Sequence, residues 1–273
     1  AETPVAPAEG GFALLVAEAA GAGERAPVRL TLLRDAHGDG RLFVARSPEG
    51  IVAAASHPLL LRALPFGPGE PDADRLALFL ETLELPAAGT VWAGIEAVPP
   101  GGLLRLAPGA APAARRWWRP GPDPALADLG DDDLVDALEA RLRAATAGAL
   151  RAAGPRLGAM VSGGLDSTMV VAALSAEAPG LEVPAFVSVS PSGVSPEERE
   201  PQAAVFRRFP GLIRHEVSSA GLDPEGGALP AWEAQALPCI DAVLFKNVAL
   251  LAAAEAAGCD GVITGAGSTS CFR

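Results

Sequence analysis

The chain has 273 residues, 49% of them hydrophobic, which is enough for two ordinary domains with packed cores. Its 33 acidic and 21 basic residues give a net charge of −12, which offers no basic stripe for a phosphate backbone and excludes polymeric nucleic acid as an expected partner. No apolar run reaches the roughly 18 residues of a membrane span, and Cys239, Cys259 and Cys271 form no CxxC pair. We therefore expect a soluble, cytoplasmic protein that does not bind membranes.

The first half of the chain is predicted to be an α+β domain of layered sheets and helices. Strands are expected at residues 12–17, 28–34, 41–46 and 51–55, and helices at 58–64 and 74–85. A Pro-Pro-Gly-Gly break then interrupts residues 90–106. Five prolines in residues 107–130 predict a linker without regular structure, which contains the domain boundary.

The second half alternates apolar and helical segments, a pattern that predicts a parallel sheet with helices on both faces. Three aspartates at 131–133 precede an amphipathic helix at 134–150 and oppose its dipole. Strands are then expected at residues 157–161, 183–189, 212–217 and 261–264, and helices at 167–178, 196–209 and 240–257. Ligands of such sheets bind beyond the carboxyl ends of the strands.

A phosphate-binding loop is predicted where the first of these strands ends. It consists of Ser162, Gly163, Gly164, Leu165, Asp166 and Ser167. Paired glycines let the backbone approach an anion, the helix start directs N–H groups at it, and Ser162 and Ser167 add hydroxyl donors. Asp166 places a carboxylate beside the expected polyphosphate, which suits a magnesium ion between them. A Gly-Gly pair alone would be explained by a tight strand-to-helix turn, and a Walker A loop is excluded because no GxxxxGK[ST] is present.

The whole string S-G-G-L-D-S resembles the signature of ATP pyrophosphatases, and most of the chain is similar to the asparagine synthetase family. Residues 90–95 (TVWAGI) with 98–101 (VPPG) resemble the segment that closes the family's amidotransferase domain. Trp117-Trp118 stand where a Tyr-Trp pair usually follows, and residues 44–50 (VARSPEG) resemble an earlier family segment. The resemblance implies an Ntn-hydrolase-like, class II amidotransferase-like domain at residues 1–120. It also implies a parallel-sheet ATP-pyrophosphatase domain, adenine nucleotide α-hydrolase-like in fold, at residues 121–273.

The same resemblance implies a site for ATP and Mg²⁺. Val161 and Ser188 match positions that line the adenine and ribose pocket, although an ordinary strand-end hydroxyl is the alternative for Ser188. Thr264-Gly265 match a pair that contacts the nucleotide. Ser162 and Asp166 are the expected catalytic residues, and Asp166 the expected metal ligand. The expected nucleotide-binding residues are Val161, Ser162, Gly163, Gly164, Leu165, Asp166, Ser167, Ser188, Thr264 and Gly265.

Two departures from the family pattern change the expected activity. Glutamine-hydrolysing members use an N-terminal cysteine as nucleophile, and Gly10 stands at that position, so we expect no glutaminase activity. Thr269 and Ser270 replace an acidic pair that helps to hold magnesium pyrophosphate. Loss of one G before the aspartate codon would produce the observed Ser-Thr-Ser-Cys. A frameshifted or C-terminally truncated, largely inactive chain is therefore expected.

Three functions stay open at this point. The first is an asparagine synthase-type ligase that activates a carboxylate as an acyl-adenylate and transfers it to an amine. The second is a lasso-peptide or β-lactam type cyclase that uses an internal amine, with a precursor peptide as partner. The third is a non-catalytic nucleotide-binding remnant. The expected partners are thus small-molecule or peptide carboxylates and amines.

The remaining polar residues suggest no second site. His37, His57 and His215 lack the spacing of a metal site or a triad, and are expected at surface or turn positions. Lys246 is the single lysine of the chain and is expected to be solvated on its helix.

Overall fold

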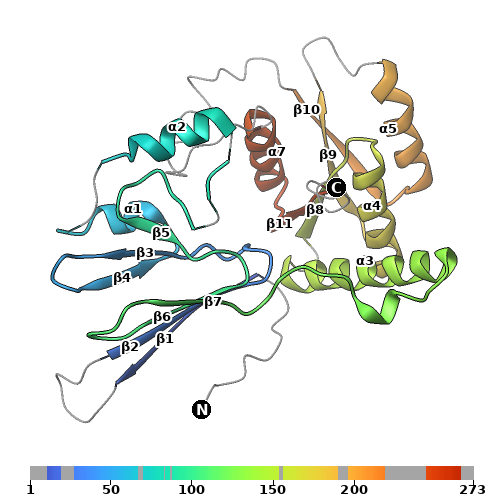
Figure 1. Cartoon of the computed structure of the whole chain (residues 1–273). Coiled ribbons are helices and arrows are strands. Elements are labelled where there is room, and N and C mark those ends of the chain that lie inside the picture. The colour runs from blue at the N-terminus through green and yellow to red at the C-terminus, as the bar shows by residue number, and fades with distance from the viewer. Residues whose placement is uncertain are drawn as a thin grey trace. The chain divides into compact units, whose positions relative to one another are not determined.

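The computed structural model describes residues 11–19, 28–66, 70–82, 84–86, 88–153, 156–189, 196–218 and 244–265 (Figure 1). The chain forms two compact units, one mainly from residues up to Gly121 and the other mainly from residues after it. Across the described residues, every helix is too short or too polar to span a bilayer.

Two antiparallel sheets make up the β structure of the first unit. One has the order β1-β2-β6-β7 and consists of β1 (Ala13–Ala19), β2 (Val28–Arg34), β6 (Gly102–Leu106) and β7 (Ala113–Arg116). The other has the order β4-β3-β5 and consists of β3 (Phe43–Arg46), β4 (Val52–Ala55) and β5 (Ile95–Ala97). Two helices, α1 (Pro58–Arg62) and α2 (Ala73–Thr82), lie between β4 and β5 in sequence.

Strand β3 shows how the layers of this unit are held together. Because side chains alternate along a strand, Val44 points to one face and packs with Leu32 of β2 and Leu106 of β6. Phe43 points to the opposite face and packs with Leu61 of α1. The unit is therefore layered as sheet, sheet and helix, as α1 above β3 and β4 in Figure 1 illustrates.

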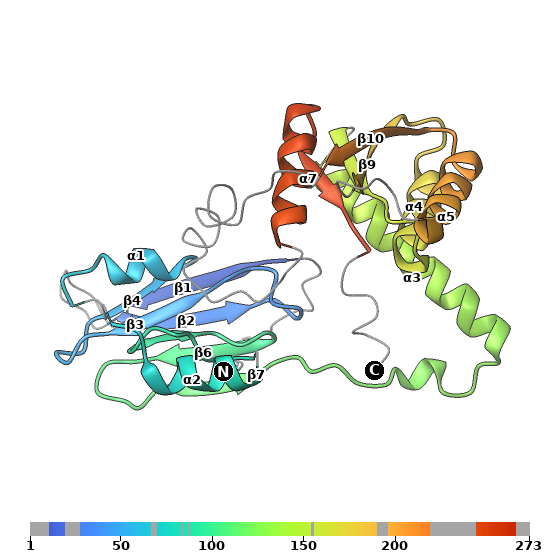
Figure 2. The ribbon, with the colours of Figure 1, turned by 90° about the horizontal axis from the view of Figure 1, so that it is seen from above.

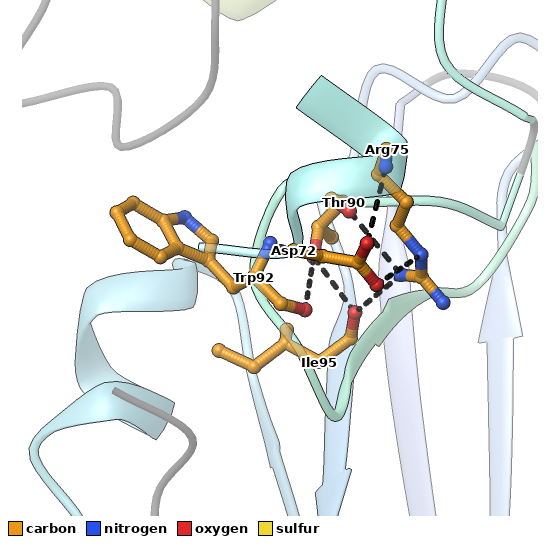
Figure 3. Close-up of polar contacts among 5 residues, drawn as sticks. All are labelled: Asp72, Arg75, Thr90, Trp92 and Ile95. Atoms are coloured by element: carbon orange, nitrogen blue, oxygen red, sulfur yellow. Dashed lines mark hydrogen bonds and ion pairs between the residues drawn. The ribbon is translucent and has the colours of Figure 1, made fainter. Parts of the chain in front are cut away.

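The segment that carries the TVWAGI string is fixed by a buried threonine (Figure 3). Thr90 is fully buried, and its hydroxyl donates to the carbonyl of Ile95 at 2.7 Å and accepts from the N–H of Trp92 at 3.1 Å. Arg75 donates to the Thr90 carbonyl at 3.2 Å and forms an ion pair with Asp72 at 3.3 Å. These bonds tie the start of α2 to the loop that enters β5.

The expectation of an unstructured linker at 107–130 is wrong in two places. Strand β7 lies within it and pairs with β6, and a short 3₁₀ helix, η1, spans Pro124–Leu126. The stretch between Pro112 and Pro120 contains no proline, so its N–H groups are free to pair with β6. Proline is also tolerated at the first position of a helix, and Asp123 caps η1 by accepting from Ala125 N–H at 3.0 Å.

The second unit is built on a parallel sheet with the order β10-β9-β8-β11, which confirms the parallel-sheet prediction. The strands are β8 (Leu157–Met160), β9 (Val183–Val189), β10 (Leu212–Ser218) and β11 (Gly261–Ile263). The helices are α3 (Asp131–Ala153), α4 (Leu165–Glu177), α5 (Pro196–Arg208) and α7 (Leu244–Ala256). Helix α3 begins at the first of the three aspartates, and residues 240–243 of the expected last helix lie outside the described part.

Helices cover both faces of this sheet, again as expected (Figure 2). On one face, Val171 of α4 and Val205 of α5 pack with Ala185 and Val187 of β9. On the other face, Leu250 of α7 packs with Phe186, the residue between them on the same strand. The near-continuous apolar character of β9 follows from this burial on two sides.

Candidate functional site

A pocket of about 270 Å³ lies at the carboxyl edge of the parallel sheet in the second unit. The ends of β8, β9 and β11 and the helices α4, α5 and α7 supply its wall, the position at which α/β sheets bind ligands. The lining residues are Met160, Val161, Ser162, Asp166, Ser167, Phe186, Ser188, Gln202, Lys246, Asn247, Leu250, Thr264 and Gly265.

The loop between β8 and α4 is closed on itself by its two serines. The hydroxyl oxygens of Ser162 and Ser167 lie 3.1 Å apart, and Ser167 Oγ also accepts from the backbone N–H of Ser162 at 3.3 Å. Ser162 Oγ accepts from Gly164 N–H at 3.2 Å. Ser167 is 7% exposed, so it forms the floor of the loop, whereas Ser162 is exposed at the pocket. These bonds connect the end of β8 to the first turn of α4.

Glycines at two positions bring neighbouring backbone against this loop. Gly163 has φ +82°, and a Cβ there would lie 2.7 Å from the backbone nitrogen of Gln202. At Gly265 a Cβ would lie 2.6 Å from the backbone nitrogen of Ser167. Any larger residue at either position would push α5 or the end of β11 away from the start of α4. Both glycines therefore serve close packing around the pocket.

The N-terminus of α4 has no side-chain cap. Gly164 is its N-cap residue, which offers no side-chain acceptor to the first-turn N–H groups. These groups carry the positive end of the helix dipole and lie where Ser162, Asp166 and Ser167 line the pocket. Such an end is suited to an anion, above all to a phosphate.

Asp166 and Lys246 are the two charged residues in the pocket lining. Asp166 is half-buried, and Lys246 is exposed. Among the described residues no group of three or more His, Cys, Asp and Glu side chains could hold a metal ion, and Asp166 is the single carboxylate of the pocket lining. One carboxylate suits Mg²⁺ only when substrate phosphates and water complete its octahedron. The residues therefore fit a magnesium ion that arrives with a polyphosphate.

The structure brings together most, but not all, of the residues singled out from the sequence. Seven of them line the pocket: Val161, Ser162, Asp166, Ser167, Ser188, Thr264 and Gly265. Gly163 instead faces α5, Gly164 caps α4, and Leu165 is 75% exposed and absent from the lining. For these three, the backbone is the part that shapes the loop.

Sequence reasoning missed several lining residues, among them Gln202, Lys246 and Asn247. Gln202 is 3% exposed, and its Oε1 accepts from Arg214 Nη2 at 3.4 Å. Because arginine can only donate, this contact uses the side-chain oxygen of Gln202 and leaves its NH2 group as the donor of that side chain.

Lys246 is exposed, as expected, but it also lies at the pocket. The only feature of the sequence that distinguishes Lys246 is that it is the single lysine of the chain.

The histidines lie outside the pocket lining, with one correction to the expectation. His215 is half-buried in β10, where its ring lies 5.1 Å from that of Phe186, so it is neither a surface nor a turn residue. His57 caps α1 by accepting from Leu59 N–H at 3.3 Å, and His37 is exposed in a bend after β2.

A family model described as asparagine synthase matches residues 137–272, which include every residue that lines the pocket. No match to a curated protein was found.

Proposed function

Because the chain belongs to the asparagine synthase family through residues 137–272, we propose that its second unit binds ATP in this pocket and activates a carboxylate as an acyl-adenylate. The domain is of the ATP-pyrophosphatase type found in amide ligases. The observation that carries the proposal is the uncapped N-terminus of α4 behind the Ser162–Ser167 turn, at the carboxyl edge of a parallel sheet.

The lining divides the pocket into a polar and an apolar part, which suits a nucleotide. The serine loop and the start of α4 would receive the phosphates, and Ser188 and Thr264 would offer hydroxyls to the ribose or the α-phosphate. Met160, Phe186 and Leu250 form an apolar wall for the base. Asp166 would hold magnesium, which when bound neutralises charge on the phosphate chain.

The proposed reaction has two steps. A substrate carboxylate oxygen attacks the α-phosphorus of ATP, and the bond to the leaving pyrophosphate breaks. An amine nitrogen then attacks the acyl carbon, AMP leaves, and the nitrogen loses a proton. The α4 N–H groups stabilise charge that develops on the phosphoryl oxygens in the first step.

Two narrower proposals rest on residues outside the described ranges. Gly10, in place of the family's cysteine, favours a first unit without glutaminase activity and a cyclase that uses an internal amine. Thr269 and Ser270, in place of the acidic pair, favour a nucleotide-binding remnant without turnover.

Nucleotide binding is the first test. We expect the purified chain to bind ATP more tightly with magnesium than without it, and Asp166→Ala to remove that difference. Asp136→Ala, which deletes an exposed carboxylate on α3, is the matched control and should bind like the wild type. Identical titration curves for Asp166→Ala and wild type under both conditions would contradict the role of Asp166.

Pyrophosphate exchange separates the enzyme from the remnant. With candidate carboxylates, the adenylation proposal requires ATP–pyrophosphate exchange by the wild-type chain. The remnant proposal instead requires little exchange by the wild-type chain and more by the double variant Thr269→Asp, Ser270→Glu. Robust exchange by the wild-type chain would rule out the remnant. Release of glutamate from glutamine above a buffer control would refute the absence of glutaminase activity.

A further inference from the structure

Lys246 lies where α7 begins, at the carboxyl edge of the parallel sheet. Leu250, one helical turn later on the same face, packs against Phe186 of β9. Helix α7 precedes β11, whose end contributes Thr264 to the pocket, so the start of α7 reaches the same edge of the sheet. Lys246 therefore lines the pocket from the sheet face opposite to α4.

The ammonium of Lys246 has no acidic partner among the described residues. Within the described part of the chain it forms no ion pair, although acidic residues outnumber basic ones by 33 to 21 overall. Asp166 lines the same pocket and does not pair with it. An acidic residue of α4 and a basic residue of α7 thus line one pocket from the two faces of the sheet.

The choice of lysine also matters. Lys246 is the only lysine among 21 lysines and arginines. An ammonium is a compact point charge with three donors on a flexible stem, whereas a guanidinium is a wide planar fork that suits a fixed bidentate partner. When the oxygens of a phosphate chain change position during a reaction, an ammonium on a flexible stem can keep contact with them better than a guanidinium.

We propose that Lys246 binds the phosphate chain of the nucleotide, opposite the Ser162–Ser167 loop, and supplies a positive charge that the loop itself lacks. This inference rests on the proposed ATP-binding function. The loop offers hydroxyl and backbone donors with only partial charge, and its one acidic residue, Asp166, does not attract phosphate unless a cation intervenes. Among the described lining residues, Lys246 is the one that carries a full positive charge.

The test is a titration of the full chain with ATP, ADP, AMP and adenosine in magnesium buffer, for wild type, Lys246→Met and Lys246→Arg. Lys246→Met should weaken ATP binding by about tenfold to a hundredfold, the range for one charge-assisted hydrogen bond. The loss should shrink from ATP to ADP to AMP and vanish for adenosine. Lys246→Arg should retain part of the ATP affinity, because its charge is kept.

Arg151→Met is the matched control, since it removes one positive charge from an exposed position at the end of α3. It should leave all four affinities unchanged. Equal ATP affinities of Lys246→Met and wild type would overturn the inference while the proposed function stands. An equal loss for all four ligands would also overturn it, because Lys246 would then support the base site or the fold. If wild type bound none of the four, both proposals would fall.

Discussion

Gly163 and Gln202 are in direct backbone contact, although they lie on a loop and a helix that are far apart in sequence. A Cβ at Gly163 would lie 2.7 Å from the Gln202 backbone nitrogen and 2.9 Å from its Cγ. The serine loop and α5 are thereby fixed to each other, with the Gln202 side chain beside the pocket. The pocket consequently depends on a glycine that does not line it.

Gly163→Ala should destabilise the chain and weaken ATP binding. Its φ of +82° costs a residue with a Cβ about 1–2 kcal/mol, and the clash with α5 adds a further 1–3 kcal/mol. Gly180→Ala is the matched control, because Gly180 has the same φ and no atom within 4 Å of its Cβ position. Urea unfolding of the two variants separates strain from clash. Equal losses would show that α5 simply moves aside.

Ser167→Ala should loosen the Ser162–Ser167 loop. The hydroxyl accepts from Ser162 N–H, lies 3.1 Å from Ser162 Oγ and donates to the Gly164 carbonyl at 3.2 Å, so its loss leaves polar groups without a partner at a 7% exposed position. We expect a loss of about 1–3 kcal/mol in the free energy of unfolding and a lower affinity for ATP. Thr168→Val, which removes a hydroxyl bond to the same carbonyl at 2.7 Å, is the control for unfolding alone. Unchanged ATP affinity in Ser167→Ala would contradict this role.

Asp35 organises the turn after β2 in the first unit. Its fully buried carboxylate accepts from the N–H groups of His37, Gly38, Asp39 and Gly40 at 2.6–3.1 Å. Burial alone would raise its pKa, but the hydrogen bonds from Gly40, Asp39 and Gly38 outweigh burial and hold the pKa below the ordinary value of 3.8.

The stabilisation from Asp35 should accordingly be fully present above about pH 3.8 and be lost as the pH falls through the lower pKa of the folded state. Asp35→Asn should cost about 1.5–3 kcal/mol near neutral pH, because an amide nitrogen would face donors. Thermal unfolding between pH 2 and pH 7 should show the two proteins converging only at the acidic end. Asp74→Asn, at an exposed position, is the control. A constant difference at all pH values would contradict the ionisation of Asp35.

Cys259 should react slowly with alkylating reagents. Burial first, and the nearby Asp260 second, raise the pKa of its thiol above the ordinary value of 9.0. In a variant with Cys239→Ser and Cys271→Ser, iodoacetamide labelling should require a higher pH in the folded chain than in urea. Equal labelling profiles in the two states would show that the fold does not protect the thiol.

The position of the Ser162–Ser167 loop could be predicted because it is local. Ser162, Gly163 and Asp166 belong to one strand, turn and helix start, and the period of the flanking apolar residues already places that turn at the edge of a parallel sheet. Strand β7 could not be predicted in the same way. Its backbone pairing depends on the presence of β6 beside it, which its own proline-flanked sequence does not reveal.

The sequence by itself determined the alternation of strands and helices in the second unit, and with it the Ser162–Ser167 loop that we propose binds phosphate. Only the tertiary structure decided which distant side chains join that loop. Gln202 on α5 and Lys246 on α7 line the same pocket as that loop because the parallel sheet brings helices from both faces to one edge. Lys246 carries no local pattern that separates it from a solvated lysine, since its proposed role depends on which residues lie opposite it in the pocket.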